Sequence, residues 1–418
     1  MGLIDVRVMA GERFNLLERG TVTSSSEDPL FLRNRLWDGR PSGDYRFASA
    51  GTDDTITVDG DLLGGLGNFE GADAIDPPGW TESNSGTGNC EIDTAQKNSG
   101  SSSLLMLAGT GFGQAYREFQ ARAGEWINIS WAIRGDAGTG VAKVRVQNPR
   151  TGRYLTPGAA WTSTLTNLAT QAAAAWATGN LTFQVEDFRT NLYQDPVLRV
   201  IVINDTGGSA WADDVYVTSG VDILTVHGHT IDPLIVPQFR SSTDNFAASD
   251  TLEGTATLDP PSFYVLLGAR VYRRYWRLKL VGLNVSGPIQ LGEMVIGQTT
   301  SLLVPYEYKP RLGRLRDRVA TTADFGEQYV YPRARWSRRT LQLVSHYESL
   351  VQYRQAVDEI YERAAGDAHP IVIVPDTALP DVLFAKGDQK HEATRTLLTR
   401  YDEHSWTLTE MPFPSAES

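Results

Sequence analysis

The sequence predicts a mainly β protein in which one β-sandwich carries a second β-sandwich inside one of its loops, followed by a small α+β domain. Three observations support this fold class. A pattern of turns and alternating strands over residues 36–59 stops at a glycine-rich stretch and resumes only at residue 221. The segment between contains many short strands, at the turn spacing typical of sandwiches and jelly rolls. Helical spacing of apolar residues first appears after residue 345.

Composition limits the possible classes of protein. The chain has 418 residues, enough for roughly two to four domains, and 41% of them are hydrophobic. Cys90 is the only cysteine, which excludes an intrachain disulfide and a cysteine-based zinc cluster. The formal net charge of −12 argues against nonspecific nucleic-acid binding. The first residues lack the pattern of a secretory signal, and no uncharged apolar stretch approaches the roughly 18 residues of a membrane helix. We therefore expect cytoplasmic synthesis and no membrane insertion.

The outer sandwich is assigned to residues 1–64 and 221–298. In residues 55–59, Ile56 and Val58 share one face and polar side chains occupy the other, which is the period-two pattern of a half-buried strand. The glycine-rich residues 60–67 mark the junction with the insert.

The inserted module is assigned to residues 65–220. In residues 126–134, alternation places Trp131 and three isoleucines on one face, which we expect to be core, and Trp126 on the other. Further strands are expected at residues 103–107, 142–146, 198–203 and 211–217.

The C-terminal section, residues 299–418, is expected to form the small α+β domain. Ser345 and Glu348 have the spacing of a capping box, apolar residues follow at helical spacing, and Gly366 is placed to end the helix. Strands are expected at residues 370–375 and 405–410.

Short motifs of the outer sandwich resemble discoidin-like domains. Those domains have an Asp-Gly turn, an Ile-Thr-Val-Asp strand, a strand ending in Gly-His-Asn and an Arg-Tyr-Trp-Arg segment before the last strand. The corresponding residues are Asp38-Gly39, Ile56-Thr57-Val58-Asp59, Gly228-His229-Thr230 and Arg274-Tyr275-Trp276-Arg277, with Thr230 in place of the usual asparagine. The resemblance implies a discoidin-like β-sandwich.

The inserted module resembles the carbohydrate-binding jelly rolls found beside xylanase and glucanase domains. It shares an opening Asn68-Phe69-Glu70, the pair Gly79-Trp80, a strand after Gly100 and a closing Trp211-Ala212-Asp213-Asp214-Val215. The resemblance implies a nested jelly roll of the carbohydrate-binding-module type.

Aromatic rings are the candidate sugar contacts, because the C–H faces of pyranose rings pack on them while polar neighbours such as Asn128, Arg134 and Gln147 serve the hydroxyls. For each single ring, packing in the core is the competing interpretation. The candidate carbohydrate-binding residues are Trp80, Trp126, Tyr154, Trp161 and Trp176.

A calcium site is the expected cofactor site. The first and last strands of a jelly roll pair, so Glu70 is expected near Asp213 and Asp214, and carboxylate oxygens are ligands that Ca²⁺ prefers. The resembled modules commonly hold a structural calcium there. The alternative is that one aspartate caps a turn and the other carboxylates are solvated.

The layout as a whole resembles tail and tail-tip proteins of tailed bacteriophages. Those often end in a short α+β domain after a Gly-Glu-x-x-Ile-Gly sequence, here residues 292–297, and carry sugar-binding jelly rolls as loop insertions. The resemblance implies a structural protein of the virion, in the tail tip or baseplate, that serves in host attachment. Other tail proteins, copies of itself in a symmetric homo-oligomer and host cell-surface polysaccharide would be its partners.

No enzyme signature is found: the sequence lacks a Gly-x-Ser-x-Gly elbow, a His-Glu-x-x-His motif and a phosphate-cradling glycine loop. We therefore expect a protein without catalytic activity. Two alternatives stay open: a polysaccharide-degrading or deacetylating tail enzyme with accessory binding modules, and a purely architectural tail protein.

Overall fold

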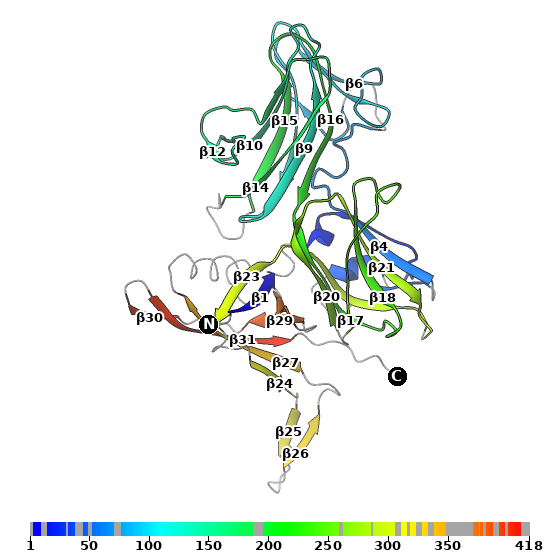
Figure 1. The fold of residues 1–418 in the computed structure, drawn as a ribbon, viewed down its shortest axis with the longest axis vertical. Coiled ribbons are helices and arrows are strands. Elements are labelled where there is room, and N and C mark those ends of the chain that lie inside the picture. Colours follow the sequence, from blue (N-terminus) through cyan, green and yellow to red (C-terminus); the bar gives the residue numbers. More distant parts are fainter. Residues whose placement is uncertain are drawn as a thin grey trace.

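The computed structural model is mainly β (Figure 1). Within the part of the chain that it describes, six sheets are formed, and no helix is long and apolar enough to cross a membrane. The described residues are 3–9, 15–30, 32–37, 45–48, 52–70, 77–186, 195–258, 262–285, 287–305, 311–315, 318–322, 328–332, 338–347, 371–375, 377–378, 382–387, 393–397 and 400–410.

The outer sandwich packs a four-stranded sheet against a five-stranded sheet. The four-stranded sheet has the order β20 (Ser262–Val271), β17 (Val221–His229), β22 (Gln290–Gly297), β3 (Tyr45–Arg46). The five-stranded sheet has the order β19 (Thr251–Thr255), β18 (Val236–Ser242), β21 (Tyr275–Leu283), β4 (Thr52–Asp59), β2 (Thr21–Ser24). The core between them includes Trp276, which is fully buried and stacks on Phe239 with ring centroids 4.9 Å apart.

The inserted module is a second sandwich, at the opposite end of the molecule from the strands β25 (Arg318–Thr322) and β26 (Gln328–Pro332) (Figure 1). Its seven-stranded sheet has the order β12 (Trp161–Thr162), β11 (Arg153–Leu155), β10 (Ala142–Asn148), β15 (Val197–Asn204), β8 (Gly113–Gln120), β5 (Thr81–Glu82), and β13 (Ala169–Gln171) pairs with β10. Its five-stranded sheet has the order β14 (Ala177–Gln184), β9 (Trp126–Arg134), β16 (Gly208–Ser219), β7 (Ser103–Ala108), β6 (Asn89–Asp93). As alternation in β9 predicts, Trp131 and its neighbouring isoleucines face the core between the two sheets.

The seam between the two sandwiches consists of two chain segments that run side by side. The chain leaves the outer sandwich after β4 and returns from β16 to β17 with only Gly220 between these strands. Asp61 forms a β-bridge with Thr218, and its carboxylate accepts the N–H groups of Leu63, Gly65 and Val217. The two apolar cores separate at this point: Leu63 belongs to the core of the inserted module, and Val221 belongs to the core of the outer sandwich.

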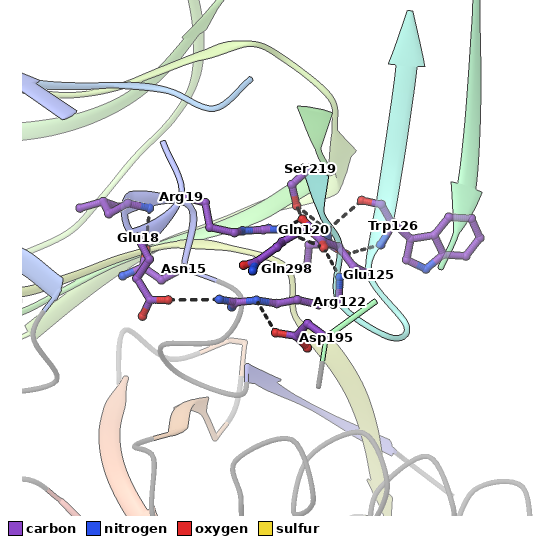
Figure 2. Close-up of polar contacts among 11 residues, drawn as sticks. Asn15, Glu18, Arg19, Gln120, Arg122, Glu125, Trp126, Asp195, Ser219 and Gln298 are labelled. Carbon is purple, nitrogen blue, oxygen red and sulfur yellow. Dashed lines mark hydrogen bonds and ion pairs between the residues drawn. The ribbon is translucent and has the colours of Figure 1, made fainter. Parts of the chain in front are cut away.

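A buried ion pair between Arg19 and Glu125 connects the outer sandwich to the inserted module (Figure 2). Glu125, on the loop between β8 and β9, is fully buried and accepts hydrogen bonds from Arg19 Nη1 at 3.2 Å and from Ser219 Oγ at 2.7 Å. Burial alone would raise the pKa of Glu125, but the Arg19 guanidinium and the Ser219 hydroxyl outweigh burial and lower it. The carboxylate therefore stays ionised within the junction.

Two further side chains, those of Arg122 and Gln298, make polar contacts around this pair. Arg122 lies 3.2 Å from Glu18 of the sandwich and 3.7 Å from Asp195. The side chain of Gln298, just beyond β22, accepts from Trp126 N at 2.9 Å and donates to Trp126 O at 2.8 Å (Figure 2). Because the contacts join residues 122–126 of the module to two separate segments of the rest of the chain, residues 18–19 and Gln298, the junction restricts how the module turns on the sandwich.

The third body is an eight-stranded sheet. Its order is β23 (Thr300–Pro305), β1 (Leu3–Met9), β28 (Ile371–Val374), β29 (Leu383–Gly387), β31 (Arg400–Glu410), β27 (Arg338–Tyr347), β24 (Arg311–Leu315), and β30 (Ala393–Leu397) pairs with β31. A separate hairpin is formed by β25 (Arg318–Thr322) and β26 (Gln328–Pro332). The strands expected near residues 370–375 and 405–410 are β28 and part of β31.

Two expectations about this section are wrong. The N-terminal strand β1 pairs with β23 and β28, so it belongs to this sheet and not to the outer sandwich. Ser345 lies within β27 opposite His404 of β31, so it is not a helix N-cap. In both cases long-range pairing decides, and a local capping pattern carries no information about a strand that arrives 59 residues later at His404. Residues 348–366, where the helix was expected, lie outside the described residues.

Candidate functional site

Two of the five candidate sugar-binding aromatics lie in the core. Trp80 and Trp161 are each 7% exposed. Trp80 packs against Phe69 with ring centroids 5.2 Å apart, and Trp161 packs against Phe183 at 6.1 Å. The assignment of both as sugar platforms is corrected, because a ring enclosed in the core has no free face. The apolar surface of each ring favours the sandwich interior.

Tyr154 lies on the outer face of the seven-stranded sheet, in a row of polar side chains. Opposed residues of antiparallel strands share a face, and the register places Tyr154, Gln147, Arg199 and Glu118 side by side across β11, β10, β15 and β8. Gln147 Nε2 donates to the Tyr154 hydroxyl at 3.1 Å, so the ring is tethered to the sheet.

A second row lies beside the first and has an aromatic ring at its far end. It consists of Arg145, Ile201 and Tyr116 on β10, β15 and β8. The Arg199 guanidinium carbon lies 3.9 Å from the centroid of the Tyr116 ring. Ile201 is only 5% exposed although it points away from the core, so charged side chains cover an apolar floor.

The charged groups of this face are held in place by ion pairs. Arg199 contacts Glu118 at 2.6 Å, Arg145 contacts Asp205 at 2.9 Å, and Lys143 also contacts Asp205. Burial alone would raise the pKa of Asp205, but Lys143 and Arg145 outweigh burial and lower it. Three cationic groups thus face two carboxylates, which leaves one positive charge in excess. We call this set, Lys143, Arg145, Gln147, Arg199, Glu118 and Asp205 with Tyr116 and Tyr154, the charged face.

The charged face has the chemistry of a saccharide-binding surface. Tyrosine rings offer packing surface, while the forked N–H groups of arginine bind hydroxyl or carboxylate oxygens in a fixed geometry. Tyr154 and Gln147 are among the residues predicted from the sequence, whereas Arg145 and Arg199 are not. The alternation of Lys143, Arg145 and Gln147 within residues 142–148 could have placed these three side chains on one face of the strand. The sequence could not show that the neighbouring side chains on the sheet come from β15 and β8.

The remaining two aromatic candidates belong to the other sheet. Trp126 is partly exposed at the start of β9 (Figure 2), and Trp176, also partly exposed, directly precedes β14. The predicted aromatic set is therefore distributed over two faces and the core, and it does not form one site.

The three expected calcium ligands converge on one loop, residues 97–102. Glu70 accepts the N–H groups of Ser101 at 2.6 Å and Ser102 at 3.2 Å. Asp213 accepts those of Asn98 at 2.8 Å and Ser99 at 3.1 Å, and Asp214 accepts the Ser99 hydroxyl at 2.7 Å.

The carboxylates bind this loop from separate positions. In the part of the chain that the structure describes, no three His, Cys, Asp or Glu side chains gather as a metal-binding group, so Glu70, Asp213 and Asp214 do not form one ligand set. Burial, together with the neighbouring Asp214 carboxylate, raises the pKa of Asp213 to about 7. Calcium at this loop stays a prediction.

Comparisons with known proteins assign no family: no family model and no curated protein matches the chain. Among solved structures, the CBM22-1 xylan-binding domain of Paenibacillus barcinonensis Xyn10C is 14% identical, with a TM-score of 0.26, over 35% of this chain and 88% of that chain. The CBM22-1–CBM22-2 tandem domain of the same protein is 11% identical, with a TM-score of 0.28, over 58% of this chain and 98% of that chain.

A phage protein is also among the structural matches. The enzymatically active domain of tailspike protein 4 of bacteriophage CBA120 is 14% identical, with a TM-score of 0.26, over 37% of this chain and 20% of that chain. At such identities and TM-scores, these matches carry no argument about function, which must rest on the site itself.

Proposed function

We propose that this protein binds an acidic polysaccharide of a bacterial cell surface through the charged face. The observation that carries the proposal is the arrangement of that face: two tyrosine rings flank arginine side chains that ion pairs hold in place over an apolar floor.

The excess positive charge favours an acidic ligand. Asp205 is shared by Lys143 and Arg145, so a carboxylate of a uronic acid or a similar sugar would complete the pairing. The rest of the protein carries a net negative charge, so a surface of this sign is a local feature of the module.

We further propose that the protein is a structural component of a phage tail tip or baseplate and has no catalytic activity. The nested layout supports this role, because the module stands at one end of the molecule while the two bodies that carry it stand at the other (Figure 1). Weak binding by one copy would become strong when a symmetric homo-oligomer presents many copies.

Affinity electrophoresis of the full-length protein in gels containing acidic polysaccharides, such as polygalacturonate or purified capsule, tests the binding function. We expect retardation that is lost in Arg145→Ala and kept in Glu186→Ala, a change on the same module at an exposed residue. Equal migration of the wild type with and without every acidic polysaccharide would contradict the proposal. Release of reducing ends or acetate from the same polysaccharides would instead favour the enzyme alternative.

A further inference from the structure

In the inserted module, the face of the five-stranded sheet that points away from the core carries a second cluster of side chains suited to binding sugar. Antiparallel register aligns Asn128 with Thr182, and Ser130 with Asn180, across β9 and β14. Both positions of β9 point away from the core, because Ile127 and Ile129, which alternate with them along the strand, are fully buried in it. Asn128 Nδ2 donates to Thr182 Oγ1 at 2.9 Å and lies 3.4 Å from Asn180 Oδ1.

Aromatic rings border this strip. Trp126 begins β9, Trp176 directly precedes β14, and Tyr216 of β16 lies opposite Ser130. From a rise of about 3.4 Å per residue, Trp126 and the level of Tyr216 are about 14 Å apart along the sheet. The two tryptophans lie at opposite ends of the β9–β14 pair. We call the set Trp126, Asn128, Ser130, Trp176, Thr178, Asn180, Thr182 and Tyr216 the neutral strip.

The neutral strip contains no ionisable side chain apart from the Tyr216 phenol. The Tyr216 hydroxyl donates to Asp214 Oδ1 at 3.0 Å. Because burial raises the pKa of Tyr216, this phenol stays protonated. The nearest charge of the outer sandwich, Arg274, lies 4.8 Å from the Tyr216 ring and is paired with Asp59 at 2.9 Å. Arg134 is the only cation on β9, β14 and β16; it lies at the Trp176 end of the strip, and its guanidinium carbon is 5.4 Å from the centroid of the Trp211 ring. These three strands therefore offer an anionic polymer no cation along the middle of the strip, at Asn128, Ser130, Asn180 and Thr182.

The side chains of the strip are small amides and hydroxyls, which donate and accept hydrogen bonds in a shallow plane. Such groups match a ligand covered with hydroxyls better than a protein partner, whose interface core needs larger apolar contacts. The strip also continues to the junction, where the backbone of Trp126 is held by Gln298 (Figure 2), so that end is held rigidly.

We propose that the neutral strip is a second saccharide-binding site, which takes an uncharged polysaccharide chain lying along β9 and β14. The module would then bind two chemically different glycans on its two opposite sheets. The neutral strip does not depend on the charged face, since the two share no residue.

The test uses the full-length protein in native gels that contain one neutral polysaccharide each: xylan, dextran, galactomannan, mannan or laminarin. We expect the wild type to be retarded in at least one gel. Trp126→Ala should bind that polysaccharide roughly tenfold more weakly, through loss of a packing surface. Asn180→Asp and Thr178→Glu change exposed positions and place a charge on the strip without touching the core, and we expect a similar loss.

Arg145→Ala is the matched control, and its affinity for the neutral polysaccharide should equal that of the wild type. Absence of retardation by all five neutral polysaccharides would overturn the second site, as would wild-type affinity of both Asn180→Asp and Thr178→Glu. Loss of neutral binding in Arg145→Ala would show that one shared site serves both ligands and would also overturn it. Failure of acidic polysaccharide binding alone would remove the proposed function and leave the neutral strip standing.

Discussion

The two outer faces of the inserted module differ in charge and in their relation to the rest of the molecule. The charged face has arginines anchored by carboxylates, and all its members come from the module itself. The neutral strip has amides and hydroxyls between aromatic rings, and its Trp126 end is bonded to the outer sandwich through Gln298. Both faces follow the same alternation of inward and outward residues, so one fold presents two surfaces whose chemistry is set independently.

The largest expected effect concerns the attachment of the module to the sandwich. Glu125→Ala leaves Arg19 without its buried partner, and we expect the free energy of unfolding to fall by about 3–5 kcal/mol, measured by urea denaturation. The control is Glu186→Ala, which breaks the exposed pair with Arg153 beside the charged face and should cost less than about 1 kcal/mol. Equal losses in the two variants would show that the junction is not a stabilising contact.

The next effect distinguishes the two faces by charge. Arg199→Ala should weaken binding of an acidic polysaccharide by about tenfold, because it removes a charge-assisted donor over Tyr116, and should leave neutral binding unchanged. Raising the salt to about 0.5 M should likewise weaken only acidic binding, since screening acts on charges. Titrations at two salt concentrations measure both effects. A salt effect of the same size on neutral binding would break the distinction.

The seam is expected to respond to pH in a way that the exposed faces do not. Burial raises the pKa of Asp61 to about 6, above its ordinary value of 3.8. As pH rises from about 4 to 6, the unfolded chain has already released this proton and the folded chain must give it up. The free energy of unfolding should therefore fall with rising pH, by on the order of 3 kcal/mol.

In Asp61→Asn the part of that fall due to Asp61 should be absent, and the part due to Asp213, whose pKa burial raises to about 7, should remain. Loss of the bond to Gly65 costs about 1 kcal/mol at low pH. Thermal or urea unfolding of both proteins at several pH values gives the comparison. Parallel pH profiles for the two proteins would exclude Asp61 as the source.

The smallest expected effect is that of calcium on the loop of residues 97–102, which connects β6 and β7 in the five-stranded sheet of the module. If calcium binds there, adding it at millimolar concentration should raise the Tm by roughly 2 °C over protein in EDTA, and Asp213→Asn should remove the increase. Acidic binding by the remote charged face should not change. The same Tm in calcium and in EDTA would refute the site.

Particular residues show how far the sequence could be interpreted. The inward orientation of Trp131 and the outward orientation of Trp126 follow from alternation within one strand and agree with the structure. The burial of Trp80 and Trp161 does not follow from alternation, because Trp80 directly precedes a strand of two residues and Trp161 begins another, and two residues are too few to show a period. The capping box at Ser345 failed for another reason: β31 pairs with that segment and outweighs its local helical signal.

By itself the sequence determined the β class, the nested order of the two sandwiches and which side of each long strand faces the core, because all three depend on local turns and on a period of two. Only the tertiary structure decided which strands are neighbours, that β1 joins the C-terminal sheet, and that Arg199 meets both Tyr116 and Glu118. Those contacts join segments such as 116 and 199, which are distant in the chain, and their register is set by packing of whole sheets. The same reason explains why five candidate rings separated into a charged face, a neutral strip and a core.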